Sequence, residues 1–157
     1  MHDITIIFNL RILKVYLGGL VIKVMRLIRE IKEFLEDHDL DVKALKKQVL
    51  GIHSILPIAL VIRILKKGGI SIGIEPQEDL RDAMEEAIES GEDIRSIVDD
   101  ILSELRDTAL ELQKMFNNKG YKVVLNLREG ESDVRDLLDE VVEEYEEVIE
   151  EEFGEEE

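Results

Sequence analysis

Three stretches of the chain alternate hydrophobic with polar residues, which is the pattern of a strand buried on one face. They are residues 4–17, 70–74 and 121–127. A fourth stretch, residues 58–65, is almost wholly hydrophobic and rich in isoleucine, which is typical of a central strand. A glycine pair follows the first and the fourth stretch and predicts a turn after each of them. We therefore expect two hairpins, of which residues 58–65 and 70–74 form the clearer one.

Residues 20–24 would be the return strand of the first hairpin, and their pattern allows two interpretations. The favoured one is a short strand that passes into a helix near Met25. The alternative is a helix that already begins at Leu20, because Val24, Leu27 and the hydrophobic residues after them follow helical spacing.

Hydrophobic residues spaced three to four apart predict five amphipathic helices. The second would run from Val42 to about His53, with Asp41 as its N-cap. The fourth is the clearest, because its hydrophobic residues keep a helical repeat from Ile94 to Phe116. The five helices are expected at about residues 25–35, 42–53, 77–88, 94–116 and 134–149.

These elements predict a two-layer α+β sandwich, in which about five mostly antiparallel strands carry about five amphipathic helices largely on one face. With 157 residues, the chain has the length of one domain and can bury a substantial core. We expect that domain to span residues 1–153. Residues 154–157 would form an acidic C-terminal tail.

Charge divides the chain into two unlike halves. Residues 1–70 contain 12 Lys and Arg against 7 Asp and Glu, which gives a net charge of +5. Residues 71–157 contain the remaining 8 of the 20 basic residues and 30 of the 37 acidic ones, so their net charge is −22 and the total is −17. This distribution favours attraction between the halves of one fold, self-association, or a basic protein as partner. Nucleic acid is not expected as a partner, because the net charge repels phosphate at long range.

The composition excludes some chemistry and narrows the class of protein. The chain has no cysteine, which excludes disulfides, zinc sites built from cysteine and thiol catalysis. It has no tryptophan and only two prolines, and lysine, glutamate and aliphatic residues fill most positions. Such a restricted composition is typical of hyperthermophile proteins and of computationally designed (de novo) ones. We therefore expect a thermostable protein of one of these origins.

No targeting or membrane-spanning segment is expected. The first residues lack the basic region, apolar run and cleavage site of a secretory signal. Residues 15–22 and 49–62 carry no formal charge, but both are shorter than the ~20 apolar residues that span a bilayer. The sequence thus predicts a soluble, cytoplasmic protein with no membrane partner.

Carboxylates are the most abundant reactive groups. Asp100, Glu104, Asp107 and Glu111 lie about one turn apart along a predicted helix, and the last helix has a similar acidic flank. Two such flanks could together hold a metal ion. The Glu-x-x-His motif of carboxylate-bridged metal sites is missing, so a solvated acidic face is the favoured interpretation.

Two other patterns resemble functional sites but lack residues that those sites need. Residues 37–41 open like a calcium loop, but Val42 and Gln48 stand where that loop needs glycine and glutamate. His53 has no Asp, Ser or Cys at a useful spacing and is expected to be a core or boundary side chain. We therefore predict no enzyme, no catalytic residue, no metal and no cofactor.

One face of the predicted sheet is the best candidate for binding. If the hydrophobic residues of each strand face the helices, their neighbours in the sequence point to the opposite face. That face would be exposed to water, pack against a second copy, or bind an anion or single-stranded RNA. The residues predicted to bind a ligand or partner there are Asn9, Arg11, Arg63, Lys122, Asn126 and Arg128.

Three functions follow, in order of preference. The first is a non-catalytic scaffold or protein-interaction module, which includes a designed protein with no natural activity. The second is a binder of a small anionic ligand or nucleic acid that uses Arg11, Arg63 and Arg128. The third is a metal enzyme built on the carboxylates of the fourth helix.

Overall fold

The computed structural model describes residue 19 and residues 22–154. They form an α+β fold around one five-stranded sheet with the order β1-β2-β3-β4-β5. The predicted strand at residues 4–17 lies outside the described residues, as do Asn9 and Arg11. The strands are β1 (Asp41–Leu45), β2 (Gln48–Ile52), β3 (Ile58–Ile64), β4 (Ile70–Pro76) and β5 (Val123–Asn126).

The first four strands form an antiparallel meander, and β5 joins β4 in parallel. The expected hairpin of residues 58–65 and 70–74 is confirmed as β3 and β4. Gly68 in its turn has a φ of +85°, a conformation that glycine adopts without steric cost. The prediction of about five strands, mostly antiparallel, is therefore confirmed for the sheet.

The predicted helix at residues 42–53 is wrong, because this segment forms the hairpin of β1 and β2. Val42, Leu45, Val49 and Ile52 are spaced three to four apart, which imitates a helical stripe. In the hairpin Val42 and Val49 point to the helices, whereas Leu45 and Ile52 point to the other face of the sheet. The described part of the chain accordingly has four helices instead of five.

The first of these helices covers residues 22–37. For the described residues 22–24, the favoured prediction of a strand is therefore wrong, and the alternative prediction of a helix is confirmed. Leu27, Ile31 and Leu35 form its buried stripe. The helix lies close to β2 at Gly51, where an added Cβ would come within 3.2 Å of the Leu35 side chain. A residue without a side chain at this position therefore makes room for the helix.

The other helices follow β4 and β5. They are α2 (Leu80–Glu89), α3 (Ile94–Asn118) and α4 (Arg128–Gly154). Asp93 caps α3 by accepting a hydrogen bond from the Ser96 N–H at 3.4 Å. Gly130 in the first turn of α4 lies directly against β4, because a Cβ there would come within 1.6 Å of the Ile74 carbonyl oxygen.

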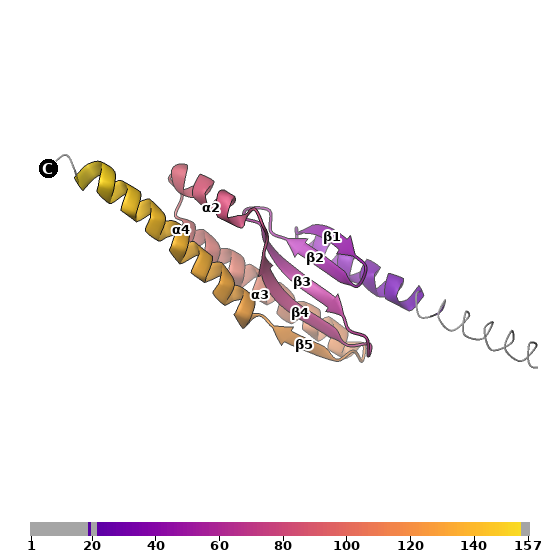
Figure 1. Cartoon of the computed structure of the whole chain (residues 1–157). Helices are drawn as coiled ribbons and strands as arrows, with labels where there is room; N and C mark the ends of the chain where they lie inside the picture. Colours follow the sequence, from indigo (N-terminus) through magenta and orange to yellow (C-terminus); the bar gives the residue numbers. More distant parts are fainter. Residues whose placement is uncertain (1–18, 20–21, 155–157) are drawn as a thin grey trace, which may run out of the picture.

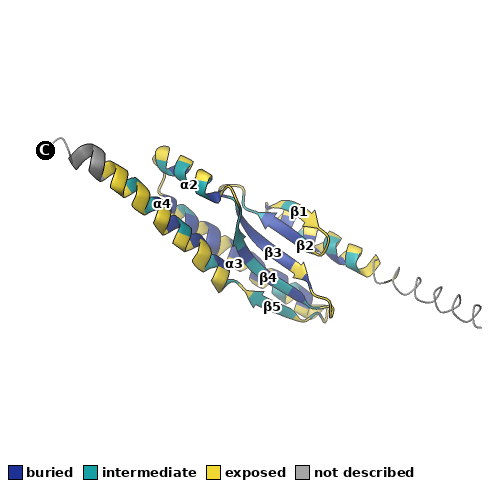
Figure 2. Cartoon of the chain, in the orientation of Figure 1, coloured by how far each residue is buried: buried dark blue, intermediate teal, exposed yellow. Residues whose placement is uncertain are grey.

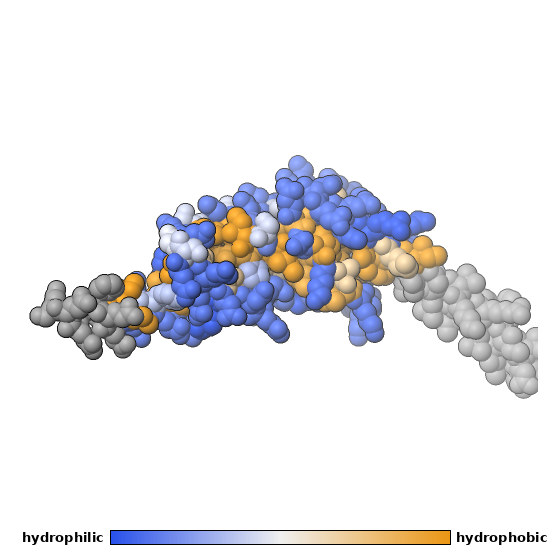
Figure 3. Space-filling model, turned by 90° about the horizontal axis from the view of Figure 1, so that it is seen from above, coloured by the Kyte–Doolittle hydropathy of each residue, from blue (hydrophilic) through white to orange (hydrophobic). Residues whose placement is uncertain are grey.

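Helix 22–37 and α3 lie behind the sheet, whereas α4 extends beyond the end of β5, with α2 beside it (Figure 1). The two-layer arrangement therefore holds over the sheet but not over the whole molecule. One large core joins the helices to the sheet face that contains Ile70, Ile72 and Ile74. The buried residues follow this interface (Figure 2), and a band of hydrophobic side chains shows between hydrophilic margins in the view from above (Figure 3).

The opposite sheet face, called the outer face below, has a small hydrophobic centre. Leu50, Ala59 and Val61 are buried there, with Ile52 packed against them. No helix in the described part of the chain is long and apolar enough to cross a membrane.

Candidate functional site

Two of the predicted binding residues lie on the outer face. Arg63 projects from β3 and Asn126 from β5, where the alternation of the strands places them. Arg63 is already engaged, because its Nη2 lies 2.6 Å from Glu75 Oε1 and its Nε donates a longer bond of 3.4 Å to Gln48. The charge that Arg63 could offer an anionic ligand is therefore largely balanced by Glu75.

Lys122 and Arg128, two more predicted binding residues, lie at opposite ends of β5. Lys122 comes just before the strand, and Arg128 begins α4 just after it. Both side chains are exposed, and neither forms an ion pair with a described residue. The structure thus places Lys122, Asn126 and Arg128 along the β5 segment, with Lys122 and Arg128 at its two ends, and leaves Arg63 two strands away on β3.

Among the described residues β5 has a free edge, because it is the last strand of their sheet. The Lys122 carbonyl accepts a hydrogen bond from the Ile70 N–H on β4 at 2.9 Å. Backbone groups of successive residues in a parallel strand point to alternate sides, so those of Val124 and Asn126 also face β4. The N–H and C=O groups of Val123 and Leu125 therefore point to the free edge.

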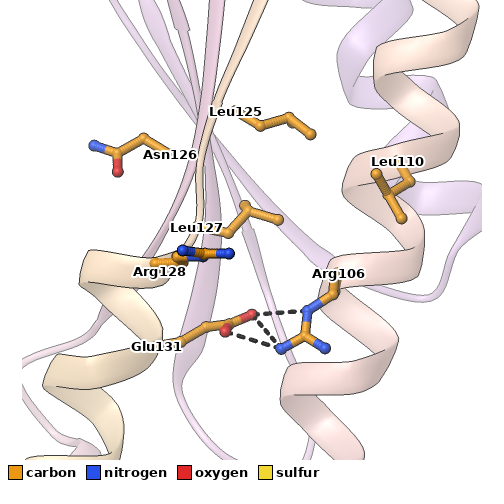
Figure 4. Close-up of a pocket in the computed structure, with 7 residues that line it drawn as sticks. All are labelled: Arg106, Leu110, Leu125, Asn126, Leu127, Arg128 and Glu131. Carbon is orange, nitrogen blue, oxygen red and sulfur yellow. Dashed lines mark hydrogen bonds and ion pairs between the residues drawn. The ribbon is translucent and has the colours of Figure 1, made fainter.

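An open pocket of about 590 Å³ lies between β5 and α3 (Figure 4). Leu125 and Leu127 of the β5 segment line it, together with Leu110 of α3, whose side chain is 47% exposed. In Figure 4, Leu125 points toward α3, whereas Asn126 points to the other side of the strand. The pocket thus combines three leucines with charged and polar side chains, and it lies beside the edge of β5; the polar lining residues are Arg106, Asn126, Arg128 and Glu131.

An ion pair closes one end of this pocket. The Arg106 guanidinium of α3 donates to both carboxylate oxygens of Glu131 on α4, with N–O distances of 2.9 to 3.1 Å. Glu131 is largely buried, with 13% of its side chain exposed, and its hydrogen bond raises the pKa of Arg106. The pair fixes α4 relative to α3 and keeps the shape of the recess.

A second open pocket, of about 610 Å³, lies where the hairpin and helix 22–37 meet α3. Here His38 Nε2 lies 2.6 Å from Glu111 Oε2, and His53 Nε2 lies 2.6 Å from Glu104 Oε2. Two members of the acidic flank, interpreted from the sequence as simply solvated, therefore have histidine partners. Sequence reasoning missed both pairs because their members are 73 and 51 residues apart.

The geometry of the histidines ties structural elements together. His53 accepts a hydrogen bond from the Ile55 N–H at Nδ1, so its Nε2 carries the hydrogen that is donated to Glu104. His53 follows β2 and lies outside any helix, which corrects its predicted place at a helix end. Across residues 22–149, no three His, Asp or Glu side chains converge as metal ligands would.

Comparison of the chain with known protein families finds no family that matches it. Searches among curated proteins and among solved structures find no match either. Any function is therefore argued from the geometry of these sites.

Proposed function

We propose that this protein is a non-catalytic interaction module that binds an extended segment of a partner protein along β5. The observation that carries the proposal is the combination of a strand edge that no described strand pairs with and a pocket beside it that contains three leucines among charged side chains. A peptide that adds a strand to a sheet gains main-chain hydrogen bonds from the edge and specificity from adjacent pockets.

The backbone of β5 supports this mode of binding. Val123 and Leu125 present their N–H and C=O groups to the free edge, which offers four hydrogen bonds to an added strand. Each such bond contributes only about 1 kcal/mol net, so the edge alone would bind weakly. A selective partner needs the pocket as well.

The pocket and its surroundings define the chemistry of the partner segment. Leu110, Leu125 and Leu127 suit one large aliphatic or aromatic side chain. Lys122 and Arg128 flank the strand and favour acidic residues near the two ends of the bound segment. The expected ligand is therefore an extended segment with a central hydrophobic residue and acidic neighbours.

The alternative function, a binder of small anions or nucleic acid on the arginine face, has less support. Glu75 holds Arg63, and Tyr121 packs edge-on against Phe116 at a centroid distance of 5.6 Å instead of offering a stacking surface. If the chain were only a scaffold, or a designed protein without activity, no partner would bind at β5. A basic protein as partner would use the acidic helices and not this edge.

Selection from a random peptide library displayed on phage tests the proposal. We expect selected peptides with a hydrophobic residue between acidic ones. Leu110→Glu, which places a carboxylate in the pocket, and Val123→Pro, which removes an edge N–H, should each weaken binding by about tenfold or more. Val124→Thr, on the outer face of the same strand, is the matched control and should bind normally. Failure to select any peptide, or equal binding by all variants, would refute the proposal.

A further inference from the structure

The two ends of the molecule carry opposite charge. The strand register places the β1–β2 turn, the β3–β4 turn and the loop before β5 at one end of the sheet. We call this the basic end, because these three connections contain six lysines and no carboxylate. The lysines are Lys46, Lys47, Lys66, Lys67, Lys119 and Lys122. The described start of helix 22–37 lies at the same end, and its Glu30 is held by Lys119 at 2.8 Å.

The acidic end is the part of α4 that follows Tyr145, whose hydroxyl donates a hydrogen bond to Glu89 of α2. No lysine or arginine follows Arg135 in the sequence, and residues 150–157 add six glutamates. Glu146 and Glu147 are exposed on this part of α4. So are Val148 and Ile149, with exposed fractions of 49% and 53%. The acidic end thus has a hydrophobic surface as well as a charge.

The basic end has a matching recess. An open groove of about 580 Å³ lies between the β1–β2 and β3–β4 turns. Leu45 and Leu65 line it and are 46% and 42% exposed, and Lys46, Lys47 and Lys66 surround them. Hydrophobic side chains reach both ends of the described part of the molecule (Figure 3).

We propose that the acidic end of α4 in one copy of this chain binds the lysine-lined groove at the basic end of the next copy. An amphipathic helix would lie in a hydrophobic groove, with Val148 and Ile149 against Leu45 and Leu65. The glutamates of α4 would face the lysines, and the negative end of the helix dipole adds to this attraction.

The net charge of −17 does not prevent such a contact. α4 contains 27 residues, which corresponds to a length of about 40 Å at 1.5 Å per residue. The two ends of one molecule are therefore separated by several screening lengths, since the Debye length is about 8 Å at physiological ionic strength. Nearby opposite charges then outweigh the distant like charges.

The contact joins two different surfaces at opposite ends of the molecule (Figure 1). Each added copy leaves one basic end and one acidic end free, so association proceeds head to tail and is not limited to a two-fold dimer. Head-to-tail association can therefore be distinguished from an isologous dimer by mixing two variants, each with only one of the two surfaces disrupted.

The test uses two variants of the full chain. Variant A carries Leu45→Asp and Leu65→Asp in the groove, and variant B carries Val148→Asp and Ile149→Asp on α4. All four positions are exposed, so folding should be preserved. Light scattering after size exclusion should show a mass that rises with concentration for the unaltered protein and monomers for A and B alone. An equimolar mixture should form a one-to-one dimer, because A keeps a working α4 and B keeps a working groove.

Leu110→Asp is the matched control, because it changes a similarly exposed leucine (47%) away from both ends. It should leave self-association intact while it disrupts the pocket beside β5, so failure of this proposal and failure of the peptide-binding proposal are distinguishable. High salt, about 1 M, shortens the Debye length to about 3 Å and should dissociate the assembly.

Two results would overturn the proposal. One is a protein that stays monomeric at every concentration and forms no dimer in the mixture. The groove would then bind either residues 1–18 of the same chain or an anionic surface. Sedimentation of the monomer with phosphatidylserine vesicles, lost in variant A, would assign the groove to a membrane surface. The other is a dimer that persists in variant A or B alone.

Discussion

The imidazole of His38 and the carboxylate of Glu111 lie 2.6 Å apart, and this pair connects the end of helix 22–37 to α3. The other ring nitrogen, Nδ1, lies 2.8 Å from the Phe34 carbonyl oxygen. Both partners are acceptors, so both ring nitrogens donate only when the ring is protonated. Burial lowers the pKa of His38, but the hydrogen bonds to Phe34 and Glu111 outweigh it, and the net pKa is raised above 6.5.

The stabilisation from His38 should therefore depend on pH. A raised pKa in the folded state means that the contribution is complete below the unfolded pKa of 6.5 and is lost as pH rises through the folded pKa. His38→Gln should lower the free energy of unfolding by about 0.5 to 1 kcal/mol at about pH 5.5, and by less at about pH 9. Urea unfolding of both proteins at the two pH values measures this difference. Glu111→Gln should show the same trend, and a loss independent of pH would contradict the assignment.

Gly130 should be intolerant of any side chain. A Cβ at this position would lie 1.6 Å from the Ile74 carbonyl oxygen, and backbone atoms cannot move aside as a flexible side chain can. We expect Gly130→Ala to destabilise the fold by about 3 kcal/mol, because α4 must shift away from β4. Ser132→Ala, at an exposed position two residues further along α4, is the control and should change the stability little. Equal denaturation midpoints for the two variants would show that α4 does not pack on β4 as described.

Gly51 should tolerate a small side chain better than a large one. An added Cβ would lie 3.0 Å from Leu40 Cδ1 and 3.2 Å from Leu35 Cδ2, which are the ends of flexible side chains. We expect Gly51→Ala to cost about 1 kcal/mol and Gly51→Leu about 3 kcal/mol. Hydrogen exchange should show faster opening of helix 22–37 in the leucine variant.

The ion pair of Arg63 and Glu75 should contribute little to stability. Both side chains are about half exposed, with values of 48% and 43%. A double-mutant cycle with Arg63→Ala and Glu75→Ala should give a coupling of about 0.5 kcal/mol that disappears at about 1 M salt. A coupling that survives high salt would mean that the pair is shielded from water, contrary to its exposure.

The sequence alone predicted those strands and helices in which the spacing of hydrophobic residues matches the face that is buried. Ile70, Ile72 and Ile74 alternate with small or polar residues after a glycine turn, so β4 could be predicted. The long repeat of α3 was equally clear. The β1–β2 hairpin was missed because Asp41 resembles a helix cap and the hydrophobic residues of two short strands fell by chance on a helical spacing.

Only part of the candidate site could be predicted from the sequence. Alternation placed Asn126 on the same sheet face as Arg63, and the structure has both residues there. The pocket beside β5 depends on Leu110 of α3, whose position relative to the strand is a product of tertiary packing. Likewise, Arg63 could be assigned to the outer face, but its pairing with Glu75 needs the register of β3 and β4.

The parallel pairing of β5 with β4 has a consequence for the order of folding. The four strands of the meander close through short connections, whereas β5 is separated from β4 by the whole of α2 and α3. Contacts between residues distant in sequence form late, because their loop-closure entropy must be overcome first. Until α3 has docked and β5 arrives, the side of β4 is an open template for another chain. We therefore expect the addition of β5 to be the slowest step of folding. The intermediate that precedes this step should be the species most prone to aggregate.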